Sequence, residues 1–491
     1  MKKLRLLFVL LWMTSNLFSS PVTGLLERID KGASSKFIIE RQKSGTDFFE
    51  LDQKGDKVII RGNDYVNIAT GLNWYLKYYA GIHLSWNGMT AKLPAVLPPV
   101  TKKERHETDL PYRYDLNYCT FSYSMAFWDW ERWEKEIDWM ALHGINLSLA
   151  LTGTESVWRN VLLKLGYTKD EINEFVAGPG FTAWWLMNNL EGWGGPNPES
   201  WYIRQEKLQK KIVKRMREYG IEPVLPGYCG MVPHNAKEKL GLNVADPGFW
   251  CSYHRPAFLQ PEDERFEEIS ALYYKELTKL YGKTGFYAID PFHEGGSTQG
   301  VNLDAAGKAI MKAMKKTNPD AVWVAQAWQD NPRTSMIEHL EAGDLLVLDL
   351  HSECRPQWGD PASEWCRKGG YGQHGWVYCM LLNFGGNIGL HGKMDALING
   401  FYDAKTDNHA GKTLCGVGMT PEGIENNPVM YELVMELPWR EHRFTRDEWL
   451  KGYVYARYGV EDEALQQAWD LLGNGIYNLS LIHISEPTRL G

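Results

Sequence analysis

The chain has 491 residues, of which 44% are hydrophobic and 13% aromatic, and its formal net charge is −8. This hydrophobic content is sufficient for a large core, and the length predicts two to four domains. The charge is mixed and forms no basic stripe, which argues against nucleic acid as a partner.

The first residues have the pattern of a secretory signal peptide. A basic start, MKKLR, precedes a short apolar run, and small residues follow at Ser19 and Ser20. The apolar run is too short to span a bilayer, and no later segment is long and apolar enough to do so. We therefore assign residues 1–23 to a cleaved signal and expect an exported protein, periplasmic or secreted if bacterial, with no membrane span.

Residues 24–105 are predicted to form a small N-terminal α/β domain. Apolar residues alternate in FIIERQ and in FFELDQKGDKVIIRG, which predicts strands and a hairpin turn at Lys-Gly-Asp. YVNIATGLNWYLKYYAG then predicts a helix that ends at Gly81. The prolines and charges of LPAVLPPVTKKERHE are typical of a linker.

From residue 106 to residue 440, short apolar runs alternate with amphipathic stretches. One such stretch, residues 128–144, places Trp133, Ile137, Met140 and Ala141 on one helix face. Eight strands are predicted, at 113–119, 145–153, 221–229, 286–294, 321–328, 344–351, 375–383 and 414–422. Their alternation with helices predicts a (β/α)8 TIM barrel. The alternative is an open doubly wound sheet, but the first strand lacks the Gly-rich phosphate turn of that fold.

Two further segments flank or interrupt the predicted barrel. Residues 178–201, between the second and third strands, are rich in Trp, Gly, Asn and Pro, and long loops of this kind are often functional in barrels. RFTRDEWLKGYVYARYG and DEALQQAWDLLGNGIY predict two helices, so residues 441–478 are interpreted as the start of a truncated C-terminal all-α domain.

Several predicted strands end in polar residues, and two of these residues are glutamates. Glu294 ends the fourth strand and Glu422 ends the eighth. In a barrel these ends meet on one face, and two carboxylates beneath an aromatic rim are what glycoside hydrolysis requires. The alternative for each glutamate is a structural ion pair or a helix N-cap.

No cofactor or metal is predicted from these residues. His293–Glu294 does not begin an HExxH zinc motif, because Ser297 occupies the second His position. The other histidines lack the spacing of ligands, the seven cysteines contain no CxxC pair, and no Gly-x-Ser-x-Gly elbow is present.

Four segments carry a resemblance to a known family. YRYDLNYCTFSYSMAFWDWERWEKEIDWMALHGINLSLALTGTESVW, AIDPFHEGG, LLNFGGNIGLHG and GMTPEGIENNPVMYELVMELPW resemble the α-N-acetylglucosaminidases of glycoside hydrolase family 89. The resemblance runs from about residue 24 to about residue 478. It implies an N-terminal α/β domain, a (β/α)8 barrel, an all-helical C-terminal domain, and a retaining exo-enzyme without cofactor.

The resemblance also implies roles for individual residues. Glu294 matches the acid/base and Glu422 the nucleophile, so their carboxyl groups are expected about 5–5.5 Å apart. Human-type members have Asn directly before the acid/base, where this chain has His293, which leaves the hydrogen-bond partner at this position open. The remaining matches line the sugar pocket: Asn117, Cys119, Tyr123, Trp184, Trp328, Leu381 and Phe384.

The implied partner is a glycan with terminal α-linked N-acetylglucosamine, on heparan-type or mucin-type chains, and a homo-oligomer is possible. The alternative function is a non-catalytic carbohydrate-binding relative that uses the same aromatic rim. The two glutamates at the matched positions argue against that alternative.

The last residues, NLSLIHISEPTRLG, have no helical pattern. Leu479 to Arg489 can be encoded by a transposon-end adapter used in sequencing libraries, so residues 479–491 are interpreted as a read-through artefact. On this hypothesis the gene continues into the helical domain. The 491-residue chain is then expected to be poorly soluble and nearly inactive, because an apolar interface would be exposed.

Overall fold

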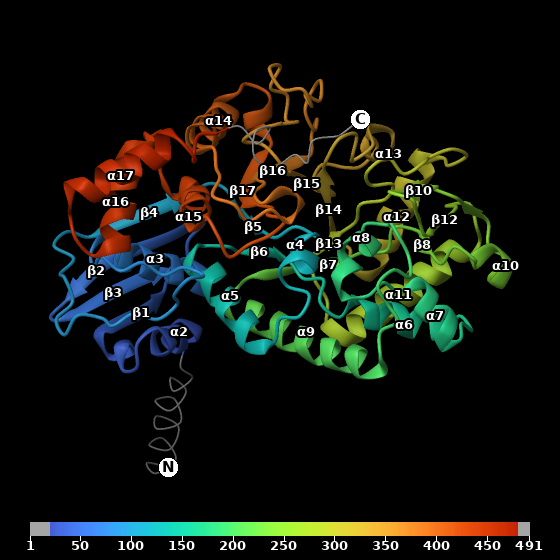
Figure 1. The fold of residues 1–491 in the computed structure, drawn as a ribbon, viewed down its shortest axis with the longest axis horizontal. Coiled ribbons are helices and arrows are strands. Elements are labelled where there is room, and N and C mark those ends of the chain that lie inside the picture. Colours follow the sequence, from blue (N-terminus) through green and yellow to red (C-terminus); the bar gives the residue numbers. More distant parts are fainter. Residues whose placement is uncertain (1–19, 480–491) are drawn as a thin grey trace, which may run out of the picture.

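The computed structural model describes residues 20–479. The predicted signal up to residue 19 and the predicted artefact from residue 480 lie outside the described residues. Figure 1 shows the N-terminal domain beside a barrel, with the last helices lying against the N-terminal domain. In the described part of the chain, no helix combines the length and the hydropathy needed to cross a membrane.

The N-terminal domain is a four-stranded sheet with one long helix packed on it. The strands follow the order β1-β3-β2-β4, with a parallel β1–β3 pair and two antiparallel pairs. The predicted hairpin is confirmed, with Lys54 opposite Lys57. The element bounds are α2 Pro21–Ile29, η1 Ala33–Lys36, β1 Phe37–Arg41, β2 Asp47–Lys54, β3 Lys57–Gly62, α3 Tyr65–Tyr78 and β4 Glu104–Thr108.

Two details of this domain differ from the sequence prediction. Helix α2 begins before residue 24, and its Val22 is fully buried, so the folded domain extends into the range predicted as signal. The predicted linker contains strand β4. Its polar residues hide the alternation, because Glu104 accepts a hydrogen bond from Trp74 and His106 stacks on Phe49.

The barrel consists of eight parallel strands and is closed. Each strand pairs in parallel with the next along the chain, and the last pairs with the first. This confirms the predicted TIM barrel and excludes the open sheet. The strands are β5 Tyr112–Asp115, β6 Leu147–Leu149, β7 Glu222–Pro226, β13 Phe286–Ala288, β14 Val322–Ala327, β15 Leu345–Asp349, β16 Gly375–Met380 and β17 Leu414–Met419.

Amphipathic helices cover the outside of the barrel. In α5, Asp129 caps the first turn by accepting the N–H of Arg132, and the predicted face with Trp133 and Ile137 is buried. The barrel helices are α4 Thr120–Tyr123, α5 Trp130–Leu142, α6 Thr154–Lys164, α7 Lys169–Phe175, α9 Glu199–Tyr219, α11 Arg265–Tyr281, α12 Leu303–Thr317, α13 Thr334–Ile337, α14 Met394–Thr406 and α15 Pro428–Glu436.

Two insertions rise from the barrel. The predicted aromatic insertion forms η2 Pro179–Phe181 and α8 Thr182–Leu186 before α9 begins. A second insertion, between β7 and β13, was not predicted and forms two small sheets. Its elements are β8 Met231–Val232, α10 Ala236–Leu240, β9 Val244–Ala245, β10 Phe249–Trp250, β11 Tyr253–His254 and β12 Ala257–Leu259.

The two helices predicted after residue 440 are present. α16 spans Arg446–Tyr458 and α17 spans Glu463–Asn474. α16 packs on α3, and α17 packs on α16. The contact with α3 is close, since a Cβ at Gly452 would lie 2.4 Å from the Tyr78 ring. The short turns η3 Phe384–Gly386, η4 Ala410–Lys412 and η5 Leu437–Trp439 complete the described elements.

Candidate active site

The barrel places the two predicted glutamates opposite each other. Glu294 follows β13, the fourth strand of the ring, and Glu422 follows β17, the eighth. In a ring of eight parallel strands, the fourth and eighth are across from each other and their carboxyl ends open on the same mouth. The two carboxylates interact, because the charge of Glu294 contributes to the pKa of Glu422.

The backbone that presents Glu294 is held in a costly conformation. Phe292 and Glu294 have φ values of 57° and 48°, in the left-handed region that non-glycine residues rarely adopt. Arg255, fully buried, donates hydrogen bonds to the carbonyls of His293 (2.9 Å) and Glu294 (2.8 Å). Arg255 thus fixes the turn in which the acid/base candidate sits.

Both hydrogen bonds to the Glu294 carboxylate reach the same oxygen. Asn189 Nδ2 and Trp250 Nε1 donate to Oε2 at 3.0 and 2.6 Å, and Arg255 in turn donates to the Asn189 amide oxygen. Within the described part of the chain, Oε1 accepts no hydrogen bond. A proton on Oε1 would therefore be available for transfer.

Trp250, Asn189 and Arg255 were not predicted from the sequence. Asn189 lies inside the aromatic insertion, whose composition did indicate a functional loop. Trp250 and Arg255 belong to the second insertion, where short irregular strands give no period to recognise.

Glu422 is held by the neighbouring strand and by η3. Its N–H donates to the Leu382 carbonyl at 3.0 Å, and its Oε2 accepts the N–H of Gly385 at 2.6 Å. Gly385 and Gly386 both have positive φ, and a Cβ at Gly386 would lie 2.8 Å from the Tyr123 ring. Glycine is therefore required for η3 to approach both Glu422 and Tyr123.

Burial dominates the electrostatics of Glu422. Loss of solvent raises its pKa to about 7; the Gly385 N–H opposes the shift, and the charge of Glu294 adds to it. Glu422 is therefore protonated in acid and becomes an anion, the form that can attack carbon, near neutral pH.

Two predicted pocket residues, Asn117 and Cys119, follow β5 at the mouth of the barrel. Asn117 donates from Nδ2 to the Thr420 carbonyl at 3.3 Å and accepts the Cys119 N–H at 2.9 Å. This ties the end of β5 to the segment before Glu422. Burial, and then the charges of Glu422 and Glu294, raise the pKa of the Cys119 thiol well above its usual range. The Cys119 side chain is therefore an uncharged thiol and not a nucleophile.

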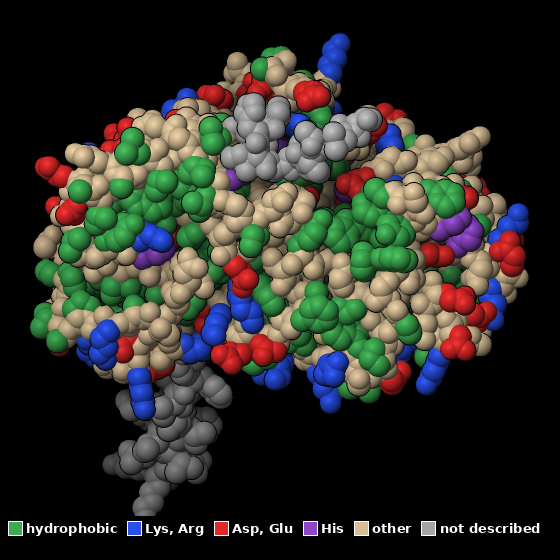
Figure 2. Space-filling model, viewed as in Figure 1, with side chains coloured by type: hydrophobic (Ala, Val, Ile, Leu, Met, Phe, Trp, Pro, Cys, Tyr) green, Lys and Arg blue, Asp and Glu red, His purple; other side chains and the backbone are tan. Residues whose placement is uncertain are grey.

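Aromatic side chains form two groups at the mouth. On the Glu294 side, Trp184 contacts Tyr123 edge-on with ring centroids 5.1 Å apart, and stacks on Trp250 at 6.1 Å. In the second group, Trp328, which follows β14, stacks on Phe384 at 5.8 Å. Figure 2 shows hydrophobic side chains gathered at the surface over α4 and α8. Flat apolar faces of this kind suit sugar rings.

His293 and Leu381, two further predicted pocket residues, are both buried. His293 follows β13, directly before Glu294, and Leu381 follows β16, the neighbour of β17. Neither ring nitrogen of His293 has a hydrogen-bond partner in the described part of the chain, and burial lowers its pKa. A neutral imidazole with free nitrogens can donate one hydrogen bond to a ligand. The Leu381 N–H bonds to the Glu353 carboxylate, so its backbone is occupied internally.

Asp290, which also follows β13, has a structural role. It accepts hydrogen bonds from the Gln326 N–H (2.7 Å) and side-chain amide (3.3 Å), which tie β13 to β14. Burial raises its pKa to about 7 despite these donors. Of the polar residues at this strand end, Glu294 is thus the one whose carboxylate retains a free oxygen.

A closed barrel with two opposed, interacting carboxylates and an aromatic rim defines the class of the glycoside hydrolases. Residues 113–441 match the model of the α-N-acetylglucosaminidase (NAGLU) TIM-barrel domain, and residues 20–99 match that of its N-terminal domain. The chain belongs to this family, glycoside hydrolase family 89.

Individual relatives agree with this assignment. The chain is 40% identical to human α-N-acetylglucosaminidase over 456 residues, which cover 89% of this chain and 60% of the human protein. The family 89 glycoside hydrolase of Clostridium perfringens, solved with 2-acetamido-1,2-dideoxynojirimycin, is 35% identical with a TM-score of 0.87. That match covers 94% of this chain and 52% of the other, so this chain spans only part of both relatives' length.

A more distant structure shows the fold alone. The exo-β-N-acetylglucosaminidase of Vibrio harveyi, from family 20, has a TM-score of 0.52 at 13% identity.

Proposed function

We propose that this protein is an exo-acting, retaining α-N-acetylglucosaminidase. The observation that carries the proposal is the pair of glutamates on opposed strands, each held by its own hydrogen bonds, with the charge of Glu294 raising the pKa of Glu422. Membership in family 89 supports the sugar specificity.

The reaction proceeds by two displacements. Ionised Glu422 attacks the anomeric carbon while Glu294 donates the proton on Oε1 to the glycosidic oxygen, so the glycosidic bond breaks and a glycosyl ester forms. Water then attacks the same carbon as Glu294 takes its proton, which releases the Glu422 carboxylate and restores the Glu294 acid. Two inversions give net retention of the α configuration.

The substrate class follows from the relatives. A Clostridium perfringens relative with two Glu-to-Gln substitutions was solved in complex with its substrate GlcNAc-α-1,4-galactose. We therefore propose terminal α-linked N-acetylglucosamine as the group removed here, from mucin-type or heparan-type chains. The neutral imidazole of His293, where human-type members have Asn, would donate one hydrogen bond to this sugar.

Hydrolysis of p-nitrophenyl α-N-acetylglucosaminide tests the proposal. Proton NMR of the first product should show the α anomer before mutarotation, and 2-acetamido-1,2-dideoxynojirimycin should inhibit competitively. The β anomer as first product would contradict the retaining mechanism. Binding of the iminosugar without turnover would instead favour the second candidate function, a non-catalytic carbohydrate-binding protein, which the aromatic rim also supports.

A further inference from the structure

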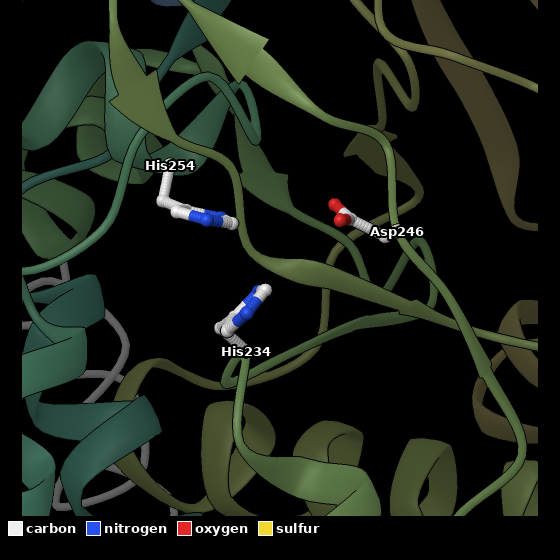
Figure 3. Close-up of side chains that lie close together, drawn as sticks. All are labelled: His234, Asp246 and His254. Atoms are coloured by element: carbon white, nitrogen blue, oxygen red, sulfur yellow. The ribbon is translucent and has the colours of Figure 1, made fainter.

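A cluster of three potential metal ligands lies in the second insertion and includes neither glutamate. His234, Asp246 and His254 are exposed, and their ligand atoms all lie within 4.8 Å of one another. Figure 3 shows the two imidazoles and the carboxylate directed toward a common space from three separate segments, and Figure 2 shows histidines at the surface over β8 to β12. The imidazole centroids are 4.1 Å apart.

The donor set suits a borderline transition metal. Two imidazole nitrogens and one carboxylate oxygen, with a water in the fourth position, are a common tetrahedral zinc set, whereas magnesium and calcium prefer oxygen alone. Ligand atoms around tetrahedral zinc are about 3.3 Å apart, given bonds of about 2.0–2.1 Å. Small side-chain rotations would bring the three groups from their present spacing to that geometry.

Neighbouring groups hold the ligands in place. The Gly248 N–H donates to Asp246 Oδ1 at 2.8 Å, which orients the carboxylate. Glu191 connects the two histidine segments through their backbones. Its carboxylate accepts the backbone N–H of His234 at 3.1 Å, and its own backbone N–H donates to the His254 carbonyl at 3.2 Å.

The cluster is connected to Glu294 through one short hairpin. His254 ends β11, which pairs with β10 so that Trp250 lies opposite Tyr253. The Trp250 indole donates to the Glu294 carboxylate, and Arg255, directly after His254, bonds to the Glu294 carbonyl. An ion shared by His234, Asp246 and His254 would link this hairpin to the segments that carry His234 and Asp246.

We propose that His234, Asp246 and His254 bind one divalent transition-metal ion of the zinc type. The bound ion stiffens the β10–β11 hairpin and so positions Trp250 and Arg255 against Glu294. The ion takes no part in bond breaking. This site could not be predicted from the sequence, because its three ligands are spread over 21 positions without a ligand motif.

Binding is tested by calorimetry with Zn²⁺ and by the visible spectrum of Co²⁺. The experiment uses the full chain without an affinity tag, and all variants are made in a Cys251→Ser background. This exposed thiol lies near the cluster and could bind zinc itself. We expect one ion per chain and a tetrahedral Co²⁺ spectrum. Removal of a group that only hydrogen-bonds to a metal ligand already lowers metal affinity about 10–100-fold. His234→Ala and His254→Ala each remove a ligand itself and should lower the affinity for Zn²⁺ at least about 100-fold.

The matched control is His442→Ala, which removes an exposed histidine far along the chain and should leave affinity unchanged. Each variant should show a cooperative melting transition without zinc, which shows that it folds. Zinc should raise the melting temperature of the background protein but not that of the two ligand variants. Equal affinity in all variants, or an octahedral Co²⁺ spectrum, would mean adventitious surface binding and overturn the site.

The effect on Glu294 is tested separately and rests on the proposed function. Zinc should increase kcat on a glycan substrate more than on the p-nitrophenyl glycoside, because protonation matters more for a poor leaving group. A chelator should reverse this increase, and the ligand variants should not respond to zinc. Tight binding with no change in kcat would overturn the coupling alone, whereas a chain that neither hydrolyses the glycoside nor binds the iminosugar would count against the proposed function and leave the metal-binding result intact.

Discussion

At the residue scale, Glu294 and Glu422 differ in what their carboxylates contact. Glu294 accepts two side-chain N–H groups on one oxygen, while Glu422 accepts one backbone N–H. Different surroundings are what two carboxylates need in order to take different roles in one reaction.

Replacement of each glutamate by alanine should separate the roles. Glu422→Ala is expected to abolish glycosylation of every substrate, since the covalent step needs the nucleophile. Glu294→Ala should retain more activity on activated aryl glycosides, which leave with little protonation. Azide should rescue both variants, giving a β product with Glu422→Ala and an α product with Glu294→Ala, as read by NMR. Identical products would contradict the assignment.

The raised pKa of Glu422 predicts the pH profile. Its pKa is about 7, and attack needs the anion, so kcat/KM should fall about tenfold per pH unit below about pH 7. Glu294→Gln, assayed on an activated aryl glycoside, removes the neighbouring negative charge and should move this limb to lower pH. A limb that is unchanged in Glu294→Gln would show that the two carboxylates do not interact.

At the element scale, strained backbone gathers where barrel strands end. Non-glycine residues with positive φ follow several strands, and they include Leu116, Phe292, Glu294, Gln329, Asn383, Glu425 and Asn427. Such conformations persist where surrounding structure imposes them. Around Glu294 that structure is the second insertion, through Arg255 and Trp250.

The Trp250 indole offers a test of that insertion. Trp250→Phe keeps an aromatic ring beside Trp184 but removes the N–H that donates to Glu294. A hydrogen bond to a charged group contributes about 1.5–3 kcal/mol, so kcat should fall about 10- to 100-fold on glycans. Cys251→Ser, at an exposed position in the turn of the same hairpin, is the control and should change kcat little. Equal losses in both variants would indicate a general effect of the hairpin.

At the scale of the whole molecule, a buried ion cluster joins three parts of the chain. Lys77 of α3 contacts Glu432 at 3.2 Å and Glu436 at 2.5 Å on α15, and lies 4.4 Å from the Trp449 ring of α16. Burial by itself would raise the pKa of Glu432, but His83 and Lys77 outweigh it and lower the pKa to about 2. The N-terminal domain, the barrel and the last helices are therefore coupled in stability.

Removal of the Lys77 charge should destabilise this whole assembly. Lys77→Met removes the cation that two buried carboxylates share and leaves Glu432 with His83 and Glu436 with Arg440. The loss should cost up to about 3–5 kcal/mol in the free energy of unfolding measured with urea. Lys92→Met breaks an exposed pair with Asp30 and should change the free energy of unfolding little. A cost as small for Lys77→Met would show that the cluster is not desolvated.

The same cluster predicts acid sensitivity. Glu432 and Glu436 have folded pKa values of about 2, below the ordinary value of 4.5, so their contribution is complete above about pH 4.5 and is lost as pH falls toward 2. Unfolding free energies measured at intervals between pH 6 and pH 2 should decline in that window. Lys77→Met should flatten the decline.

Periodic patterns allowed much of this protein to be predicted from sequence. The eight barrel strands were found because buried parallel strands are short apolar runs between amphipathic helices, and a closed barrel follows from their number. Glu294 and Glu422 became candidates because the carboxyl ends of such strands open on one mouth, and the resemblance to family 89 implied their separate roles. Strand β4 was missed, since its inward residues Glu104 and His106 are polar.

Only the tertiary structure could show what surrounds the glutamates. Trp250, Asn189 and Arg255 reach Glu294 from two insertions that lack helical or strand periodicity, so their positions depend on packing against the barrel. The pKa of Glu422 depends on how deeply the folded chain buries it. The distance between residues along a chain carries no information about such contacts, because long-range packing creates them.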